Sequence, residues 1–136
     1  MNTDILIIGS GPGGYETAAY AARLGREVTV VEERLAGGTC LNCGCIPTKS
    51  LVHDARLAVA ATDKAARFAA AMARKNGVVE TLRQGVEGLL QQPGIRLVRG
   101  HARFVADRTV CVGPERIEAR HVIIATGSEA RMPPVP

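Results

Sequence analysis

Three cysteines within six residues are the part of the sequence best suited to chemistry. Cys40, Cys43 and Cys45 lie among glycines, and Lys49 follows Cys45 after one helical turn. A cysteine at a helix start and close to a lysine ionises near neutral pH, because both features stabilise the thiolate. Such a thiolate exchanges quickly with disulfides. The spacing therefore predicts that Cys40 and Cys45 form a disulfide that is made and broken during a reaction.

The same cysteines also suit other kinds of site. With His53 they could ligate zinc, although structural zinc sites usually join two separated pairs of ligands. An iron–sulfur cluster would need Cys111 as a further thiolate and meets the same objection. A non-catalytic nucleotide-binding module with a thiol switch is another alternative. We expect Cys43 to be a small apolar filler, with a third exchanging thiol as its alternative, and Cys111 to be a small hydrophobe.

A glycine-rich turn upstream fits the phosphates of a dinucleotide. Gly9, Gly11 and Gly14 satisfy the pattern G-x-G-x-x-G, between an apolar run and a helical segment. In this motif the first glycine permits a tight turn, the second lets the backbone approach a pyrophosphate, and the third allows close helix–strand packing. Glu32 follows at the distance expected for an acceptor of ribose hydroxyl groups. The motif alone does not separate FAD from NAD.

The elements that would hold these residues form an α/β pattern. Continuous apolar runs predict strands of a parallel sheet at residues 4–9, 28–32 and 121–125. Helices are expected at residues 13–24, from Cys45 towards Ala60, and from Phe68 to Leu89. Residues 33–44 are expected as a glycine-rich loop. Short β-type segments predict a small antiparallel meander at residues 95–99, 102–105, 109–112 and 116–119.

Composition narrows the class of protein. The chain has 136 residues, enough for one domain, and its 46% hydrophobic and 22% charged residues suit a globular fold. The net charge is +4, but the basic residues are scattered along the sequence, and aromatic residues make up only 3% of it. Both features disfavour a nucleic-acid partner. No targeting or membrane-spanning segment is evident, so a cytoplasmic location is expected. His53, His101 and His121 are expected to be ordinary polar residues.

These motifs resemble the flavin-dependent pyridine nucleotide–disulfide oxidoreductases. The resemblance rests on the Gly9 turn, Glu32, the cysteine segment with Lys49, and the segments at residues 100–102 and 125–128. Leu41 and Ile46 resemble the branch that oxidises dihydrolipoamide, whereas mercuric and glutathione reductase relatives tend to carry valine there. The resemblance implies a Rossmann-like FAD-binding domain, of which residues 1–136 would be the N-terminal part. The NAD-binding and dimer-interface domains would lie outside this chain.

The resemblance also implies roles for single residues. Cys40 would exchange with the dithiol of a lipoyl-bearing protein or a small substrate, and Cys45 would lie against the flavin, near Lys49. The reduced flavin would pass a hydride to NAD⁺ in a homodimeric full-length enzyme. No metal, nucleic acid or membrane partner is expected. The expected cofactor contacts are Gly9, Ser10, Gly11, Pro12, Gly13, Gly14, Glu32, Glu33, Gly38, Thr39, Lys49, Ala102, Thr126 and Gly127.

Overall fold

A computed structural model describes residues 1–57, 63–129 and 131–134. Its centre is one six-stranded sheet with the strand order β3-β2-β1-β6-β5-β4. The strands are β1 (Asn2–Ile8), β2 (Val28–Glu32), β3 (Ile95–Arg99), β4 (Ala102–Ala106), β5 (Thr109–Val112) and β6 (Glu115–Ile124). The helices are α1 (Pro12–Arg23), α2 (Gly38–Asn42), α3 (Cys45–Leu57) and α4 (Lys64–Leu90). The predicted α/β class, with parallel and antiparallel parts, is confirmed.

The parallel half of the sheet contains the three strands that the apolar runs predict. In the middle of β1, Ile7 lies opposite Val30 of β2 and Ile123 of β6. All residues of β2 are buried. Both faces of β1 and β2 are covered, which is why their sequences are continuously apolar rather than alternating, whereas Ile124 at the end of β6 is 67% exposed.

The prediction that residues 95–99 begin the meander is wrong. They form β3, which pairs in parallel with β2 from Val28↔Ile95 to Glu32↔Arg99. A parallel neighbour requires a long crossover, and the helices between β2 and β3 supply it. Gly100 interrupts the β pattern after β3 in the same way as a hairpin turn would, so the local sequence gives no sign of the different pairing.

The last two predicted β segments are one continuous strand. The first part of β6 pairs antiparallel with β5, for example Val110↔Ile117, and its later part pairs in parallel with β1. The meander therefore consists of β4, β5 and the first part of β6. This strand joins the meander to the parallel sheet without a turn, so the two form a single sheet.

Two hydrophobic clusters lie on opposite faces of the sheet. Ile7 and Val30 face the helices and pack with Ala18 of α1 and Leu90 of α4. On the other face Leu6, Ile8 and Val31 pack with residues of β5 and β6, including Val110 and Ile117. Successive residues of β1 thus serve different clusters, as the two-residue repeat of a strand requires. Both clusters anchor the carboxyl end of β1, where the glycine turn begins.

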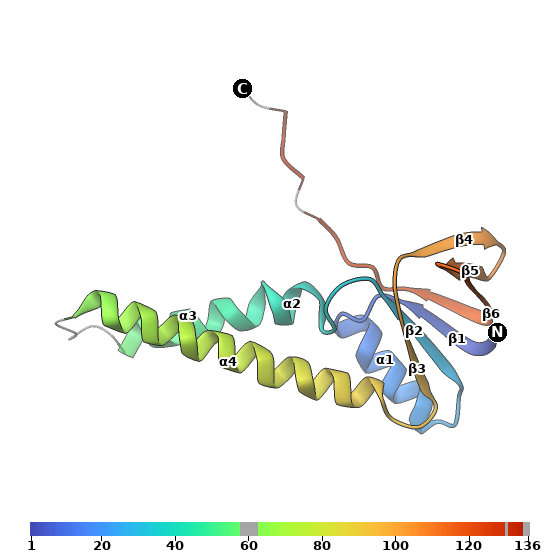
Figure 1. Ribbon diagram of the computed structural model, residues 1–136, viewed down its shortest axis with the longest axis horizontal. Helices are drawn as coiled ribbons and strands as arrows, with labels where there is room; N and C mark the ends of the chain where they lie inside the picture. The colour runs from blue at the N-terminus through green and yellow to red at the C-terminus, as the bar shows by residue number, and fades with distance from the viewer. Residues whose placement is uncertain (58–62, 130, 135–136) are drawn as a thin grey trace.

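The helices α3 and α4 form a hairpin that extends beyond the sheet (Figure 1). Residues 33–44 are not all loop, because they include the short helix α2. The predicted end of the cysteine helix at residue 60 lies outside the described residues. Helix α4 is longer than the predicted segment, and only its C-terminal part packs on the core: Val86 is buried, whereas Phe68 is 65% exposed. Among the described helices, none is both apolar enough and long enough to cross a membrane.

Candidate dinucleotide and dithiol site

The glycine turn after β1 is packed so closely that side chains would not fit. Gly9 has a φ of +101°, and a Cβ atom there would lie 2.3 Å from the carbonyl oxygen of Ala125. A Cβ on Gly14 would lie 2.0 Å from the carbonyl oxygen of Gly9. The turn is held between neighbouring strands, because Gly9 N–H donates to Val31 O and Ala125 N–H donates to Ile8 O, both at 2.8 Å. The backbone therefore requires glycine at both positions.

The start of α1 has the properties of a phosphate-binding site. Gly11 is the N-cap, Pro12 occupies the first turn, and no side chain caps the helix. A Cβ on Gly13 would meet nothing within 4 Å. The first N–H groups of a helix have no partner within the helix, and together with the helix dipole they attract anions. These observations fit a pyrophosphate group at this turn.

The cysteine segment lies directly against the glycine turn. Gly38 has a φ of +61°, and a Cβ there would lie 2.7 Å from the Cα of Gly11. Gly37 N–H donates to the carbonyl oxygen of Ser10 at 2.9 Å. The contact brings together two segments that the sequence analysis assigned to the same cofactor, and the next residue, Thr39, is exposed beside them.

Glu32 is buried below the glycine turn and already holds it. Its Oε2 accepts hydrogen bonds from the N–H and the hydroxyl of Ser10 at 2.8 and 2.7 Å, and its Oε1 accepts the N–H of Arg34 at 2.8 Å. A carboxylate accepts about four hydrogen bonds, so one further ribose hydroxyl fits. Burial is the largest influence on the pKa of Glu32 and raises it, but these hydrogen bonds and the nearby Arg99 outweigh burial and leave the pKa below its ordinary value.

Four further predicted cofactor residues, Glu33, Ala102, Thr126 and Gly127, follow strands of the sheet, whereas Lys49 is exposed on α3. Gly100 N–H donates to the carbonyl oxygen of Glu32 at 2.9 Å, which places the following Ala102 at the start of β4 near the end of β2. Glu33 pairs with His101, with 2.7 Å between Oε2 and Nδ1. Thr126 and Gly127 follow β6 in a segment without regular secondary structure, and Gly127 has a φ of +76°. The Glu33–His101 pair joins residues far apart in the sequence, so no local pattern predicts it.

The two candidate redox cysteines are brought together on neighbouring helices. Cys40 lies in α2 and Cys45 begins α3, and both are free thiols. A hydrogen bond with the Cys45 side chain, removal from water and the negative charge of Cys45 raise the pKa of Cys40 above its ordinary value. The N–H of Cys45 and the charge of Lys49 act in the opposite direction. Two adjacent thiols in this arrangement are suited to forming a disulfide.

The other thiols and histidines are placed differently. Cys43 is the C-cap that follows α2; its side chain is exposed, and its N–H donates to Thr39 O at 3.0 Å. Cys111 is half-buried between two buried valines of β5, as expected for a small hydrophobe. His53 and His121 are exposed. Within the part of the chain that the structure describes, no three histidine, cysteine or carboxylate side chains are grouped as metal ligands.

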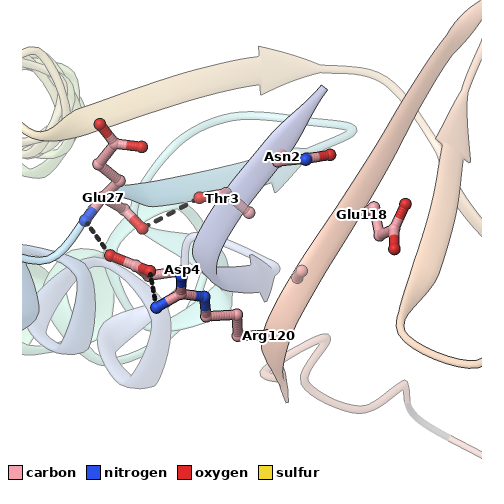
Figure 2. A pocket seen from close by; sticks show the side chains of 7 residues that line it. Asn2, Thr3, Asp4, Glu27, Glu118 and Arg120 are labelled. Atoms are coloured by element: carbon pink, nitrogen blue, oxygen red, sulfur yellow. Dashed lines mark hydrogen bonds and ion pairs between the residues drawn. The ribbon is translucent and has the colours of Figure 1, made fainter.

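A separate pocket lies at the opposite edge of the sheet, at the amino end of β1 (Figure 2). Several of its polar groups already have partners: Asp4 pairs with Arg120 at 3.3 Å and accepts the N–H of Glu27 at 3.2 Å. Thr3 donates its hydroxyl to the carbonyl oxygen of Glu27 at 3.0 Å. In α/β sheets ligands bind at the carboxyl ends of the strands, so this pocket is not part of the candidate site.

Asn42 is a residue of the site that the sequence analysis passed over. Its side-chain amide donates to the carbonyl oxygens of Ala36 and Gly38 at 2.9 and 3.0 Å, which closes the loop in front of α2. Its carbonyl oxygen accepts a hydrogen bond from Arg83 of α4 at 3.4 Å. The only signal in the sequence is its place inside the cysteine segment, since its partners are backbone groups and a distant arginine.

Comparison with known proteins identifies one family and several relatives that match nearly the whole chain. The family model for pyridine nucleotide-disulphide oxidoreductases matches residues 3–136. The chain is 45% identical to dihydrolipoyl dehydrogenase 2 of Haloarcula marismortui, over 93% of this chain and 30% of that protein. It is 43% identical to the dihydrolipoyl dehydrogenase of Haloferax volcanii, over 93% of this chain and 30% of that protein.

A solved structure with the same fold is a Cu(II) complex of RclA, the HOCl-induced flavoprotein disulfide reductase of Escherichia coli. The TM-score is 0.88 at 36% sequence identity, and the match covers 100% of this chain and 31% of RclA. The chain therefore spans about a third of the length of the proteins it matches. With the family model matching nearly all of its residues, the chain belongs to the pyridine nucleotide-disulphide oxidoreductase family.

Proposed function

We propose that this chain is the N-terminal part of the FAD-binding domain of a dihydrolipoyl dehydrogenase-like enzyme. The observation that carries the proposal is the contact between the glycine turn and the cysteine segment at Gly11 and Gly38. This contact supports an arrangement in which the pyrophosphate binds at the glycine turn, beside the pair Cys40 and Cys45. The names of the relatives support the choice of dihydrolipoamide, bound to a protein or free, as the reductant.

In this proposal the chain's own residues hold the cofactor and exchange the dithiol. The first turn of α1 and Gly38 bind the pyrophosphate, and Glu32 accepts a hydrogen bond from the ribose next to the adenine. Thr39 and Lys49 face the cofactor from the cysteine segment, and Ala102, Thr126 and Gly127 border it from the ends of β3 and β6. FAD, when bound, accepts two electrons from a dithiol and passes a hydride to NAD⁺.

The protein's thiols carry out the exchange step. One sulfur of the substrate, as a thiolate, attacks Sγ of Cys40 in the disulfide, and the Cys40–Cys45 bond breaks with Cys45 leaving as a thiolate. The second substrate sulfur then displaces Cys40, so that the substrate ends as a disulfide. Two electrons pass from the substrate to the cysteine pair. Lys49 stabilises negative charge on the pair, because its charge favours thiolate there.

A reductase that passes electrons in the opposite direction is the second candidate. It is favoured by the structural similarity to RclA, which is named a disulfide reductase. Both candidates use the same cysteine pair and FAD, and NAD⁺ or its reduced form would bind in a domain outside this chain. We expect the full-length enzyme to be a homodimer, as the resemblance implies.

The test uses the enzyme that contains this chain, with cysteine variants. Cys45→Ser and Cys40→Ser should each remove oxidation of dihydrolipoamide by NAD⁺ while leaving FAD bound, because the groups proposed to hold the pyrophosphate and the ribose are the first turn of α1, Gly38 and Glu32, and neither sulfur is among them. Cys43→Ser is the matched control and should retain turnover. Near-normal turnover of Cys45→Ser would overturn the proposal, and faster reduction of a disulfide by NADH than oxidation of dihydrolipoamide would favour the second candidate.

A further inference from the structure

Helix α4 contacts both of the helices that carry the candidate redox cysteines. It runs alongside α2 and α3 (Figure 1). Two of its arginines make these contacts through their side chains: Arg74 reaches α3 and Arg83 reaches α2. Neither arginine belongs to the glycine turn or to the cysteine segment, and the proposed function gives neither of them a role.

Arg74 holds α3 at three groups. Its Nε lies 2.9 Å from both carboxylate oxygens of Asp54. Its Nη2 donates to the carbonyl oxygen and the hydroxyl of Ser50 at 3.0 and 3.2 Å. Ser50 is buried and follows Lys49 in the sequence. A planar guanidinium that binds several fixed acceptors defines an orientation as well as an attraction, so Arg74 fixes α3, which begins at Cys45.

Arg83 holds the end of α2. Its Nη1 donates to the side-chain oxygen of Asn42 at 3.4 Å, and the guanidinium also forms an ion pair with Glu80 on its own helix. Asn42 is the last residue of α2, which carries Cys40, and it also binds the carbonyl oxygen of Gly38. The contact therefore connects α4 to the helix of the second sulfur.

A disulfide demands a narrow range of geometry, with Cβ atoms about 3.5–4.5 Å apart. Cys40 and Cys45 lie on different helices, so the angle between α2 and α3 decides whether this range is reached. We propose that Arg74 and Arg83 are positioning residues, which fix α3 and α2 against α4 and so hold the two sulfurs ready to form a disulfide. This role rests on the proposed function of the cysteine pair. It identifies residues outside the pair that influence the equilibrium between the Cys40–Cys45 dithiol and its disulfide.

The effect should be positional rather than electrostatic. The charges with the largest effect on the pKa of Cys40 are those of Cys45 and Lys49. The charge of Arg74 is paired with Asp54, and that of Arg83 is paired with Glu80. Removing either arginine should therefore change the disulfide equilibrium without changing the pH at which Cys40 ionises.

The experiment measures the equilibrium between the Cys40–Cys45 dithiol and dithiothreitol. A background of Cys43→Ser and Cys111→Ser leaves only the pair. Each oxidised dithiothreitol takes two electrons and two protons from the pair and becomes a dithiol, while the pair becomes a disulfide. We expect Arg74→Ala to lower the equilibrium constant for disulfide formation about tenfold, which is a potential about 30 mV less negative. Arg83→Ala should change it in the same direction by a smaller factor, since it makes one long hydrogen bond.

The matched control is Arg67→Ala. Arg67 is exposed on the same helix and makes no side-chain hydrogen bond to any residue in the described ranges, so the equilibrium should not change. Arg74→Lys keeps the positive charge but loses the planar guanidinium that binds several acceptors at once. It should therefore also lower the equilibrium constant for disulfide formation. Because Arg74 and Asp54 act as a pair, adding Asp54→Asn to Arg74→Ala should have little further effect.

Three results decide the matter. If the background protein forms no Cys40–Cys45 disulfide, the proposed function fails, and this inference fails with it. If the disulfide forms but the constants of Arg74→Ala, Arg74→Lys and Arg83→Ala equal that of Arg67→Ala, only the positioning role is overturned. Ile117→Val shortens a buried side chain in the meander, and an equal loss in that variant would mean that general destabilisation explains the effect.

Discussion

Gly44 lies so close to Cys40 that a Cβ atom on it would be 3.3 Å from the Cα of Cys40. The same atom would be 2.9 Å from the carbonyl oxygen of Thr39. This close approach lets α3 begin against the turn of α2, which brings Cys45 beside Cys40. The glycine between the cysteines therefore has a steric reason, and its φ is not in the left-handed region.

Gly44→Ala should force α2 and α3 apart. Because the contact is with backbone atoms, which cannot turn away as a side chain can, we expect a loss of about 1–3 kcal/mol in the free energy of unfolding. The disulfide of Cys40 and Cys45 should also form less readily. Gly77→Ala is the control: a Cβ there meets nothing within 4 Å inside α4, so it should stabilise the protein by about 0.5–1 kcal/mol. Denaturant unfolding measures both, and equal effects of the two changes would contradict the steric account.

Removing Cys45 should lower the pKa of Cys40. The hydrogen bond with Cys45 is the largest cause of the raised value, whereas Lys49 lowers it. In reduced protein, the rate of Cys40 alkylation should therefore rise at lower pH in Cys45→Ala than in the wild type. Lys49→Met should move the rate profile to higher pH. Alkylation rates of the Cys40 peptide by mass spectrometry give the two profiles, and an unchanged profile in Cys45→Ala would show that the thiols are not neighbours.

The raised pKa of Cys40 also makes the stability of the reduced protein depend on pH. The folded protein binds the Cys40 proton more tightly than the unfolded chain does, so the contribution to stability is present below the ordinary pKa of the thiol. It is lost as the pH rises through the raised value. Reduced wild-type protein should thus lose stability at alkaline pH more steeply than reduced Cys40→Ser.

Glu32→Gln should make the protein less sensitive to acid. The pKa of Glu32 is lowered in the fold, so its carboxylate contributes stability above its ordinary value, and this contribution is lost as the pH falls through the lowered value. We expect Glu32→Gln to be less stable by about 1–3 kcal/mol at neutral pH, because buried donors of Ser10 lose a charged acceptor. The difference should shrink below about pH 4.

The control for Glu32→Gln is Glu118→Gln. Glu118 is exposed beside the pocket at the opposite edge of the sheet (Figure 2). The Glu118→Gln protein should have the same free energy of unfolding as the wild type at each pH. Unfolding curves at several pH values measure the three proteins, and a constant difference between Glu32→Gln and wild type across the acid range would contradict the assignment.

Gly14→Ala should damage the site by a different route from Gly13→Ala. A Cβ on Gly14 would collide with the carbonyl oxygen of Gly9, so this change should separate α1 from β1 and destabilise the fold. A Cβ on Gly13 meets nothing within 4 Å, so Gly13→Ala should fold normally. Any weakening of FAD binding in Gly13→Ala would then report the space that the pyrophosphate needs. Thermal unfolding and flavin fluorescence separate the two effects, and equal stability of both variants would be contrary to expectation.

The isolated 136-residue chain should bind FAD weakly and show no NAD-linked turnover. It spans about a third of the length of its relatives, and under the proposed function the parts of those proteins that it does not match would complete the cofactor site and bind NAD⁺. Fluorescence titration with FAD and an assay with dihydrolipoamide and NAD⁺ test this expectation. Sustained NADH production by the chain alone would refute it.

The sequence was most informative where one short segment determines one local structure. The Gly9 turn, the strands β1 and β2 and the helix start at Cys45 depend on neighbouring residues, and their predicted positions are nearly correct, whereas β6 begins six residues before the predicted strand at 121–125. The pairing of β3 was not, because a strand's neighbour is chosen by the crossover and not by its own five residues. Helix α2 was missed because glycines at its start favour a loop in isolation, whereas contact with Gly11 and the Asn42 amide stabilises it here.

Contacts between residues far apart in the sequence could not be predicted from local patterns either. Ser10 and Glu32 were both named, but as separate cofactor contacts, and their mutual hydrogen bonds appear only when β1 and β2 lie side by side. The arginines of α4 gave no signal because charged residues on an exposed helix usually face solvent. Their partners, Ser50 and Asn42, become evident only when the helices are packed together.

The most direct test of the central claim is to identify which thiols are oxidised and reduced together. The enzyme that contains this chain is alkylated before and after one equivalent of dihydrolipoamide, and the modified cysteines are found by mass spectrometry. We predict that Cys40 and Cys45 are protected from alkylation before reduction and become reactive together afterwards. Cys43 and Cys111 should each be alkylated to the same extent before and after reduction. A disulfide that includes Cys43, or Cys40 and Cys45 fully reactive in the oxidised enzyme, would contradict the account.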